Sequence, residues 1–250
     1  MKRMHIKISS AVALVASLLL AGCVVAPQRN SKGEFPVCHT SVVNWPANLT
    51  LEQLKDEPIK QLDGGIGMSK EGVANETNVV TWREFKRLSK AGYEPTANYD
   101  LGMAGWFSSK RGIIPFWERA VPAKQSFVRP LPMNRKLLQC LPLDLGPQIS
   151  NDETEAVAQA IKAGKSWLEY YPDTKIIKQT SNSIEISATG FIITLTVMAY
   201  GDFNHDGYDD ALLCVGHSAI GGTLNYSFNA MLTRTNARDR LMAIIDSDKK

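Results

Sequence analysis

The sequence predicts an α+β fold, in which an antiparallel C-terminal sheet with a packed helix follows a loop-rich, mainly irregular and helical N-terminal half. Two observations support this prediction. After residue 174 the chain consists of short β-branched and apolar runs separated by Gly, Asn and Asp turns, which is typical of an antiparallel meander. Before residue 149 it is rich in Pro, Gly and Trp, and apolar residues show helical spacing only in short stretches.

The segment 1–22 is a predicted signal peptide. Lys2, Arg3 and Lys7 form a positive n-region, and residues 8–20 form an apolar stretch that is short for a membrane span. The segment then runs through small residues into a cysteine. The alternative interpretation is a membrane-anchoring helix that contains an incidental cysteine.

The stretch Leu20-Ala21-Gly22-Cys23 resembles the lipobox of bacterial lipoproteins. In that family the cysteine is acylated and becomes the first residue of the mature chain, so the resemblance implies lipidation of Cys23. An aspartate after the cysteine is the family's usual signal for retention in the inner membrane, whereas this chain has Val24. The resemblance therefore implies a lipid-anchored protein of the bacterial outer membrane that faces the periplasm.

The mature chain has no excess of charge of either sign. The full sequence carries 28 Lys and Arg against 25 Asp and Glu, but three of the basic residues lie in the leader, which has no acid. A nucleic-acid-binding protein needs a basic face, so we expect no nucleic-acid partner. No second apolar stretch of membrane-spanning length follows the leader, so we expect the membrane contact to be made through lipid alone.

Residues 23–36 are predicted to form a flexible lipidated tether, because they contain Pro, Ser and Gly and no apolar period. Residues 37–148 form the Trp- and Pro-rich region. Two capping boxes within it, at Thr50–Gln53 and Thr81–Glu84, predict short helices.

Aromatic residues concentrate among prolines between residues 99 and 133. Trp106, Phe107 and Trp117 are the candidates for a binding surface, since aromatic side chains are enriched at interfaces. Aromatic side chains in an irregular segment usually fill a core, so core packing is the favoured interpretation and a binding surface is the alternative.

Residues 149–250 are predicted to form the α+β domain. The capping box Ser150–Glu153 begins a helix that includes residues 152–163 and packs its apolar face on the sheet. The expected strands cover residues 175–178, 183–186, 191–200, 211–216, 223–233 and 241–245.

Three cysteines remain beyond the lipobox. Cys214 lies in an apolar run typical of a buried strand, whereas Cys38 and Cys140 lie in Pro-containing, loop-like stretches. An oxidising compartment favours pairing, so we expect a Cys38–Cys140 disulfide, with three free thiols as the alternative.

Residues 202–210 carry the pattern D-x-N-x-D-G-x-x-D, which predicts a calcium site. Calcium takes 6–8 oxygen ligands. Alternating positions of a tight loop direct Asp202, Asn204 and Asp206 inward, and the glycine at the sixth position allows the sharp turn. Tyr208 offers its backbone carbonyl, and Asp210 closes the site directly or through water.

The stretch Gly201–Leu213 resembles the strand-connecting loop of FG-GAP/VCBS-type repeats, G-D-F-N-G-D-G-x-x-D-L, which binds calcium at the rim of a β-propeller. This chain departs from that pattern at His205, where the family has glycine. It departs from an EF-hand at Leu213, where the bidentate Glu would stand, so we expect a weak calcium site with a Kd of roughly 10⁻⁴–10⁻³ M.

One copy of the loop cannot build a propeller, so we expect a single calcium-stabilised hairpin. The alternative is an Asx-turn hairpin whose acidic side chains are solvated.

No catalytic motif stands out, so we expect a non-enzymatic binding or envelope-interaction module, with a periplasmic protein as candidate partner. One alternative is an inhibitor or immunity lipoprotein that acts on a toxin or hydrolase. The other is a hydrolase of envelope glycans or lipids, which needs paired carboxylates in a cleft. Glu84, Asp100 and Glu118 are the carboxylates to examine for that role.

Overall fold

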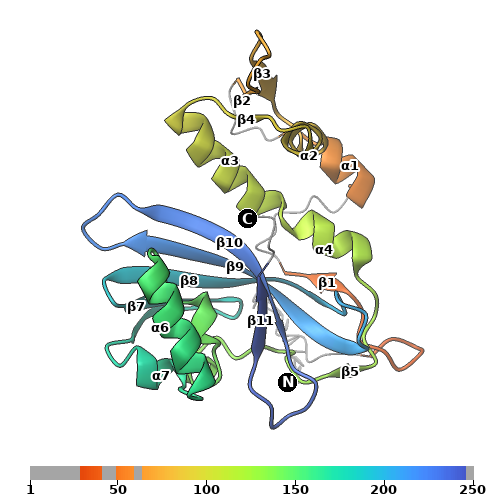
Figure 1. The fold of residues 1–250 in the computed structure, drawn as a ribbon. Coiled ribbons are helices and arrows are strands. Elements are labelled where there is room, and N and C mark those ends of the chain that lie inside the picture. The colour runs from red at the N-terminus through yellow and green to blue at the C-terminus, as the bar shows by residue number, and fades with distance from the viewer. Residues whose placement is uncertain (1–28, 41–48, 59–63, 246–250) are drawn as a thin grey trace, which may run out of the picture.

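A computed structural model describes residues 29–40, 49–58 and 64–245. The signal peptide and the predicted lipidation site Cys23 lie outside these residues. The fold is α+β, with a large antiparallel sheet in the C-terminal half, which confirms the predicted class (Figure 1). None of the helices in the described part of the chain is long and apolar enough to cross a membrane.

The large sheet is a meander in which each strand pairs with the next along the chain, in the order β11-β10-β9-β8-β7-β6. Two short N-terminal strands join it: β1 (Cys38–His39) pairs antiparallel with β8, and β5 (Gln125–Ser126) pairs parallel with β9. The meander strands are β6 (Lys175–Gln179), β7 (Ser183–Ala188), β8 (Phe191–Gly201), β9 (Tyr208–Ala219), β10 (Asn225–Thr233) and β11 (Met242–Ile245).

One face of this sheet is covered by α6 and α7 and by the segment that precedes them (Figure 1). The capping box at Ser150 forms as expected, because its hydroxyl accepts the Glu153 N–H while the Glu153 carboxylate accepts the Ser150 N–H. The elements on this side are α5 (Arg135–Leu138), the 3₁₀ helix η2 (Leu143–Leu145), α6 (Asn151–Lys162) and α7 (Trp167–Tyr170).

The opposite face is covered by a smaller unit in which four helices pack beside a three-stranded sheet of order β3-β2-β4 (Figure 1). The first two helices begin at the capping residues Thr50 and Thr81 that the sequence marks. The elements are α1 (Leu51–Asp56), β2 (Ile66–Ser69), β3 (Thr77–Val79), α2 (Trp82–Lys90), β4 (Glu94–Pro95), α3 (Asn98–Arg111) and α4 (Ile113–Arg119).

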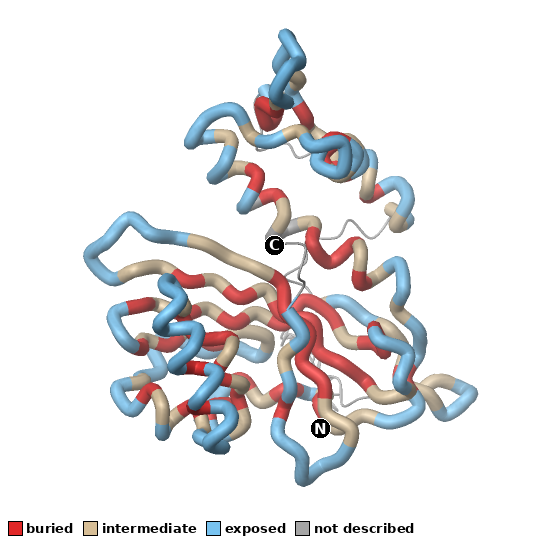
Figure 2. Tube along the Cα trace, in the orientation of Figure 1, coloured by how far each residue is buried: buried red, intermediate tan, exposed pale blue. Residues whose placement is uncertain are grey.

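The middle strand β9 is buried on both faces (Figure 2). Since successive side chains of a strand point to opposite faces, Leu213 enters the core beneath α6 and α7, whereas Leu212 enters the core beneath α3 and α4. Each core continues into the other half of the sequence. The buried residues 128–145 pack with α6 and the sheet, so the expected boundary between residues 148 and 149 does not separate two cores.

The expected tether is also shorter than residues 23–36. Asn30 to Gly33 form a hydrogen-bonded turn, and the Phe35 side chain is only 8% exposed. Phe35 and Ala123 exchange two backbone hydrogen bonds, with N–O distances of 2.7 and 3.0 Å. The apolar side chain of Phe35 explains the difference, because burying it against the domain fixes the chain around it.

Candidate metal-binding loop

The loop 202–207 joins the two central strands β8 and β9, and Gly201 pairs with Asp210 directly below it. Asp202 also exchanges two backbone hydrogen bonds of 3.0 Å with Val121, which ties the loop to the segment after α4. The turn needs left-handed backbone at two positions, Gly207 with φ 87° and His205 with φ 65°. Glycine adopts this conformation freely, whereas a residue with a Cβ is strained there.

The Asp202 carboxylate organises the inside of the loop. Its Oδ1 accepts the backbone N–H groups of His205 (2.7 Å) and Asp206 (3.2 Å), and its Oδ2 accepts that of Gly207 (2.8 Å). The residue is 3% exposed. A carboxylate offers about four lone-pair sites, so three backbone donors leave one site of Asp202 for a further ligand.

The next two side chains of the pattern contact each other and the backbone. The Asn204 Oδ1 accepts the Asp206 N–H at 3.1 Å, and its Nδ2 donates to the Asp206 Oδ2 at 2.9 Å. The Asp206 Oδ1 accepts the Tyr208 N–H at 2.8 Å. These bonds hold the tight turn that the sequence pattern predicts, and Asp206 remains exposed to solvent.

Asp210 differs from the other acids because it is fully buried. Its Oδ2 accepts the Phe203 N–H at 2.9 Å, whereas its buried Oδ1 has the Thr233 hydroxyl near it but makes no hydrogen bond of normal geometry. Burial raises the pKa of Asp210 to about 7, against the opposing effect of Thr233 and the Phe203 N–H, and the charges of the other loop acids add to the rise.

The donor chemistry of this loop fits calcium. The predicted ligands are three carboxylates, an amide oxygen and a backbone carbonyl, all of them the hard oxygen donors that calcium prefers. An unpartnered buried carboxylate oxygen is costly unless a cation compensates it. Within the described residues, no three His, Cys, Asp or Glu side chains are grouped as a ready-made metal centre. Binding therefore requires the loop carboxylates to close on the ion.

The acids of the loop are not simply solvated, as the Asx-turn alternative supposes. Asp202 and Asp210 are buried, and Asp202 accepts bonds from inside the turn. The structure thus keeps the hydrogen-bonded turn of that alternative but places two of its carboxylates away from solvent.

A buried ion pair between Arg129 and Asp209, which the sequence does not predict, lies on the other side of β9. The Arg129 Nη2 donates to the Asp209 Oδ1 at 2.6 Å, and the Ser126 hydroxyl donates to the Asp209 Oδ2 at 3.0 Å. Burial raises the pKa of Asp209, while the Arg129 and Ser126 contacts oppose that rise. Alternation along a strand shows that Asp209 faces away from Asp210, but no sequence signal names a partner 80 residues earlier.

A pocket of ≈ 420 Å³ lies against the outside of the loop. His205, Asp206 and Tyr208 line it on the loop side, and Pro122 and Lys124 line it on the other. Both the Lys124 and the Gln125 N–H donate to the Gly207 carbonyl, at 2.9 and 3.2 Å, so this wall is joined directly to the loop.

Of the three aromatic residues considered for a binding surface, Trp106, Phe107 and Trp117, one lies in the core. Phe107 is fully buried and contacts the rings of Trp82 and Phe85, so it belongs to the core. Trp117 is partly buried, with its ring 5.6 Å from that of His39. The side chain of Trp106 lies outside the described part of the structure. The apolar lining of α3 and α4 faces the sheet, which explains the burial of Phe107.

The expected Cys38–Cys140 disulfide is not formed, because neither Cys38 nor Cys140 is bonded to another cysteine. Cys38 is held opposite Tyr200 by the β1–β8 pairing, whereas the Cys140 thiol donates to the Leu137 carbonyl at 3.4 Å after α5. These anchors fix the two thiols on different elements. Burial raises the pKa of both Cys38 and Cys140, so neither has the thiolate character of a reactive cysteine.

The three carboxylates considered for hydrolysis each have a local partner. Glu118 pairs with Lys55 on α1. Asp100 accepts the Gly67 N–H at 2.9 Å, and the Glu84 carboxylate accepts the hydroxyl of its capping residue Thr81 at 3.5 Å. The three carboxylates therefore take part in helix packing and helix capping.

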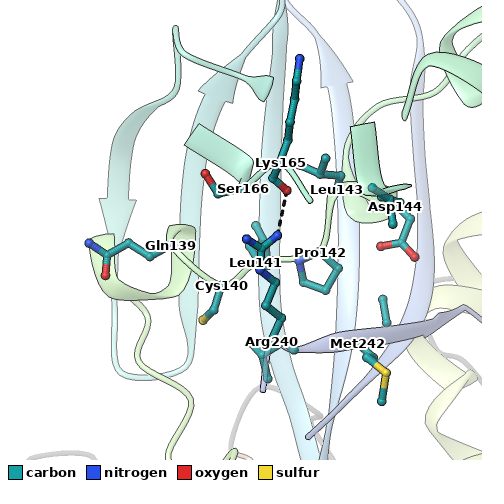
Figure 3. A pocket seen from close by; sticks show the side chains of 13 residues that line it. Gln139, Cys140, Leu141, Pro142, Leu143, Asp144, Lys165, Ser166, Arg240 and Met242 are labelled. Carbon is teal, nitrogen blue, oxygen red and sulfur yellow. Dashed lines mark hydrogen bonds between the residues drawn. The ribbon is translucent and has the colours of Figure 1, made fainter. Parts of the chain in front are cut away.

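A second pocket, of ≈ 400 Å³, lies beside the edge strand β11 (Figure 3). Its floor contains Leu141 and Leu143, and Met242 (54% exposed) contributes an open apolar wall. Lys165 and Arg240 add two cations, and the Arg240 Nη1 donates to the Lys165 carbonyl at 3.2 Å (Figure 3).

Comparison of the chain with protein-family models, curated proteins and solved structures gives no match.

Proposed function

We propose that this protein is a lipid-anchored, periplasm-facing module of the bacterial outer membrane that acts by binding rather than by catalysis, and that calcium stabilises its β8–β9 connection. The lipobox sequence ending at Cys23 supports the anchor and its location. The loop 202–210 supports the calcium.

The observation that carries the calcium proposal is the Asp210 carboxylate. It is fully buried at the base of an oxygen-lined turn, and its Oδ1 makes no hydrogen bond of normal geometry. A bound cation supplies the missing partner and joins Asp210 to the loop above it. Because β8 and β9 are the central strands of the meander, an ion at this turn stabilises the sheet on which both cores rest.

The test is a thermal melt of residues 24–250, carried out in chelator and in about 10–100 mM calcium, which is a hundredfold above the expected Kd of roughly 10⁻⁴–10⁻³ M. At a hundredfold excess over its Kd, one bound ion adds about 2.7 kcal/mol of stability. For a chain of this size that corresponds to a rise in Tm of several degrees. We expect this rise in the wild-type chain and its loss in Asp206→Ala.

Glu71→Ala is the matched control, because Glu71 is an exposed acid in the β2–β3 turn of the other sheet. It should keep the full calcium response. Equal melting temperatures of the wild-type chain in chelator and calcium would reduce the loop to a hydrogen-bonded turn.

A further inference from the structure

The chain between the predicted lipid and the folded domain is very short. Arg29, the first described residue, lies six residues after Cys23. A fully extended chain spans at most about 3.6 Å per residue, so the lipidated cysteine lies within roughly 22 Å of Arg29. The part of the domain that holds Arg29 is therefore close to the membrane surface whenever the lipid is inserted. This step rests on the proposed lipidation.

The contacts of residues 29–36 show which part of the domain lies close to the anchored end of the chain. The Arg29 Nη1 donates to the Lys124 carbonyl at 3.3 Å, and Phe35 pairs with Ala123 as described above. The Arg129 Nη1 donates to the Pro36 carbonyl at 3.0 Å. Four separate bonds thus hold the anchored end of the chain against residues 121–126 and their surroundings.

Residues 121–126 also form one wall of the pocket outside the metal-binding loop. The N-terminal turn, this wall and the loop therefore lie side by side, at the end of the sheet where Figure 1 shows β5 and the N-terminal turn together. We name their exposed residues the anchor-side surface: Lys32, Val121, Pro122, Lys124 and His205.

The anchor-side surface has the composition of a lipid-facing surface. Lys32 and Lys124 are exposed, and neither has a carboxylate within ion-pair distance among the residues that the structure describes. Val121, 38% exposed, adds an apolar side chain to the lining of the pocket beside the loop. The nearby acids are Glu34, which the Asn30 amide contacts, and the pocket-lining Asp202 and Asp206, which belong to the proposed calcium set.

We propose that the anchor-side surface binds the headgroup phosphates of anionic phospholipids, with Lys32 and Lys124 as the phosphate-binding cations. Basic side chains beside a lipid anchor add electrostatic attraction to the insertion of the acyl chains. The pocket of ≈ 420 Å³ between Lys124 and His205 gives one headgroup a place next to the loop.

The test uses the mature protein, expressed from the full sequence with its leader, in two kinds of vesicle, one of phosphatidylcholine alone and one of three parts phosphatidylcholine to one part phosphatidylglycerol. Hydrogen–deuterium exchange is measured on peptides that cover residues 29–36 and 119–126. We expect slower exchange of both segments on the anionic vesicles, and loss of that difference at molar salt because the contact is electrostatic.

The variant Lys32→Glu/Lys124→Glu should remove the difference between the two vesicles. The matched control is Lys175→Glu/Lys178→Glu, a double reversal on the exposed edge strand β6, which should leave the difference intact. Because all four lysines are exposed, a melt of each variant separates loss of binding from loss of folding.

Equal exchange on the two vesicles would overturn the headgroup contact while leaving the lipid anchor in place. Protein that fails to float with either vesicle would show that Cys23 carries no lipid, and would overturn both the anchor and this inference. The calcium proposal is tested separately, since the double variant at Lys32 and Lys124 should keep the calcium-dependent rise in Tm.

Discussion

Asp209 and Asp210 are neighbours on β9, but their carboxylates point to opposite faces of the sheet and meet different partners there. On one face, Asp209 is fully buried with Arg129 and Ser126 as partners. On the other, Asp210 is equally buried, receives one backbone N–H and faces no cation among the described residues. A buried carboxylate needs compensation for its lost hydration, so the chain itself compensates Asp209, whereas Asp210 is where an external cation has most to contribute.

The face of Asp209 also carries a second buried titratable group, His217. Its Nε2 lies 3.1 Å from the Leu145 carbonyl and donates to it, while its Nδ1 has no hydrogen-bond partner. Rings of Phe191, Tyr226 and Phe228 surround it. Protonation of His217 would place an N–H on Nδ1, where no acceptor among the described residues lies within hydrogen-bond distance. The surroundings of His217 therefore favour the neutral imidazole.

The largest expected effect comes from breaking the ion pair on one side only. Arg129→Met leaves the Asp209 carboxylate buried without its cation, which typically costs about 3–5 kcal/mol. It also removes the donor to Pro36. Urea unfolding measures the loss as a lower midpoint at unchanged slope. The matched control is Arg129→Met/Asp209→Leu, which should recover much of the stability because no uncompensated charge remains. A double variant as unstable as the single one would contradict the ion-pair explanation.

The next effect is the response of Asp210 to pH in the presence of chelator. The folded-state pKa of about 7 lies above the usual aspartate value, so the folded protein holds a proton that the unfolded chain releases. The associated stability is complete below pH 4 and is lost as pH rises from about 4 to 7, by up to about 4 kcal/mol. Asp210→Asn should abolish this loss, measured by urea unfolding across that range. If the variant kept the full wild-type dependence, the assignment to Asp210 would fail.

Some of these structural features can be predicted from the sequence, and others cannot. The fold class, the capping boxes at Thr50, Thr81 and Ser150 and the tight turn at Asp202 all depend on residues close together in the chain, and all were predictable. Local patterns fix local structure because propensity, capping and turn geometry act within a few residues.

The failures come from contacts between distant segments. Arg129 pairs with Asp209, and Phe35 pairs with Ala123, in each case across 80 residues of chain or more. No spacing rule connects residues so far apart, and the alternation of β9 shows only that two adjacent aspartates must separate. The Cys38–Cys140 disulfide fails for the same reason, since pairing needs a distance between elements that composition does not supply.

The smallest of the expected effects is the pH response of His217, and its sign is opposite to that of Asp210. Burial lowers the pKa of His217 to about 4, so the unfolded chain takes up the proton first, and stability falls as pH drops from about 6.5 to 4, by about 3 kcal/mol. In the wild-type chain this loss offsets the gain from Asp210 over much of the same range, so the two groups together should leave the free energy of unfolding nearly independent of pH between about 4.5 and 6.5 in chelator.

His217→Gln keeps a donor for the Leu145 carbonyl and removes the titration, so its urea midpoint should rise steadily as pH falls. Asp210→Asn should show the opposite slope, because the contribution of His217 is then no longer offset by that of Asp210. Parallel profiles in the two variants would mean that the two faces of β9 do not differ in the way their buried charges are compensated.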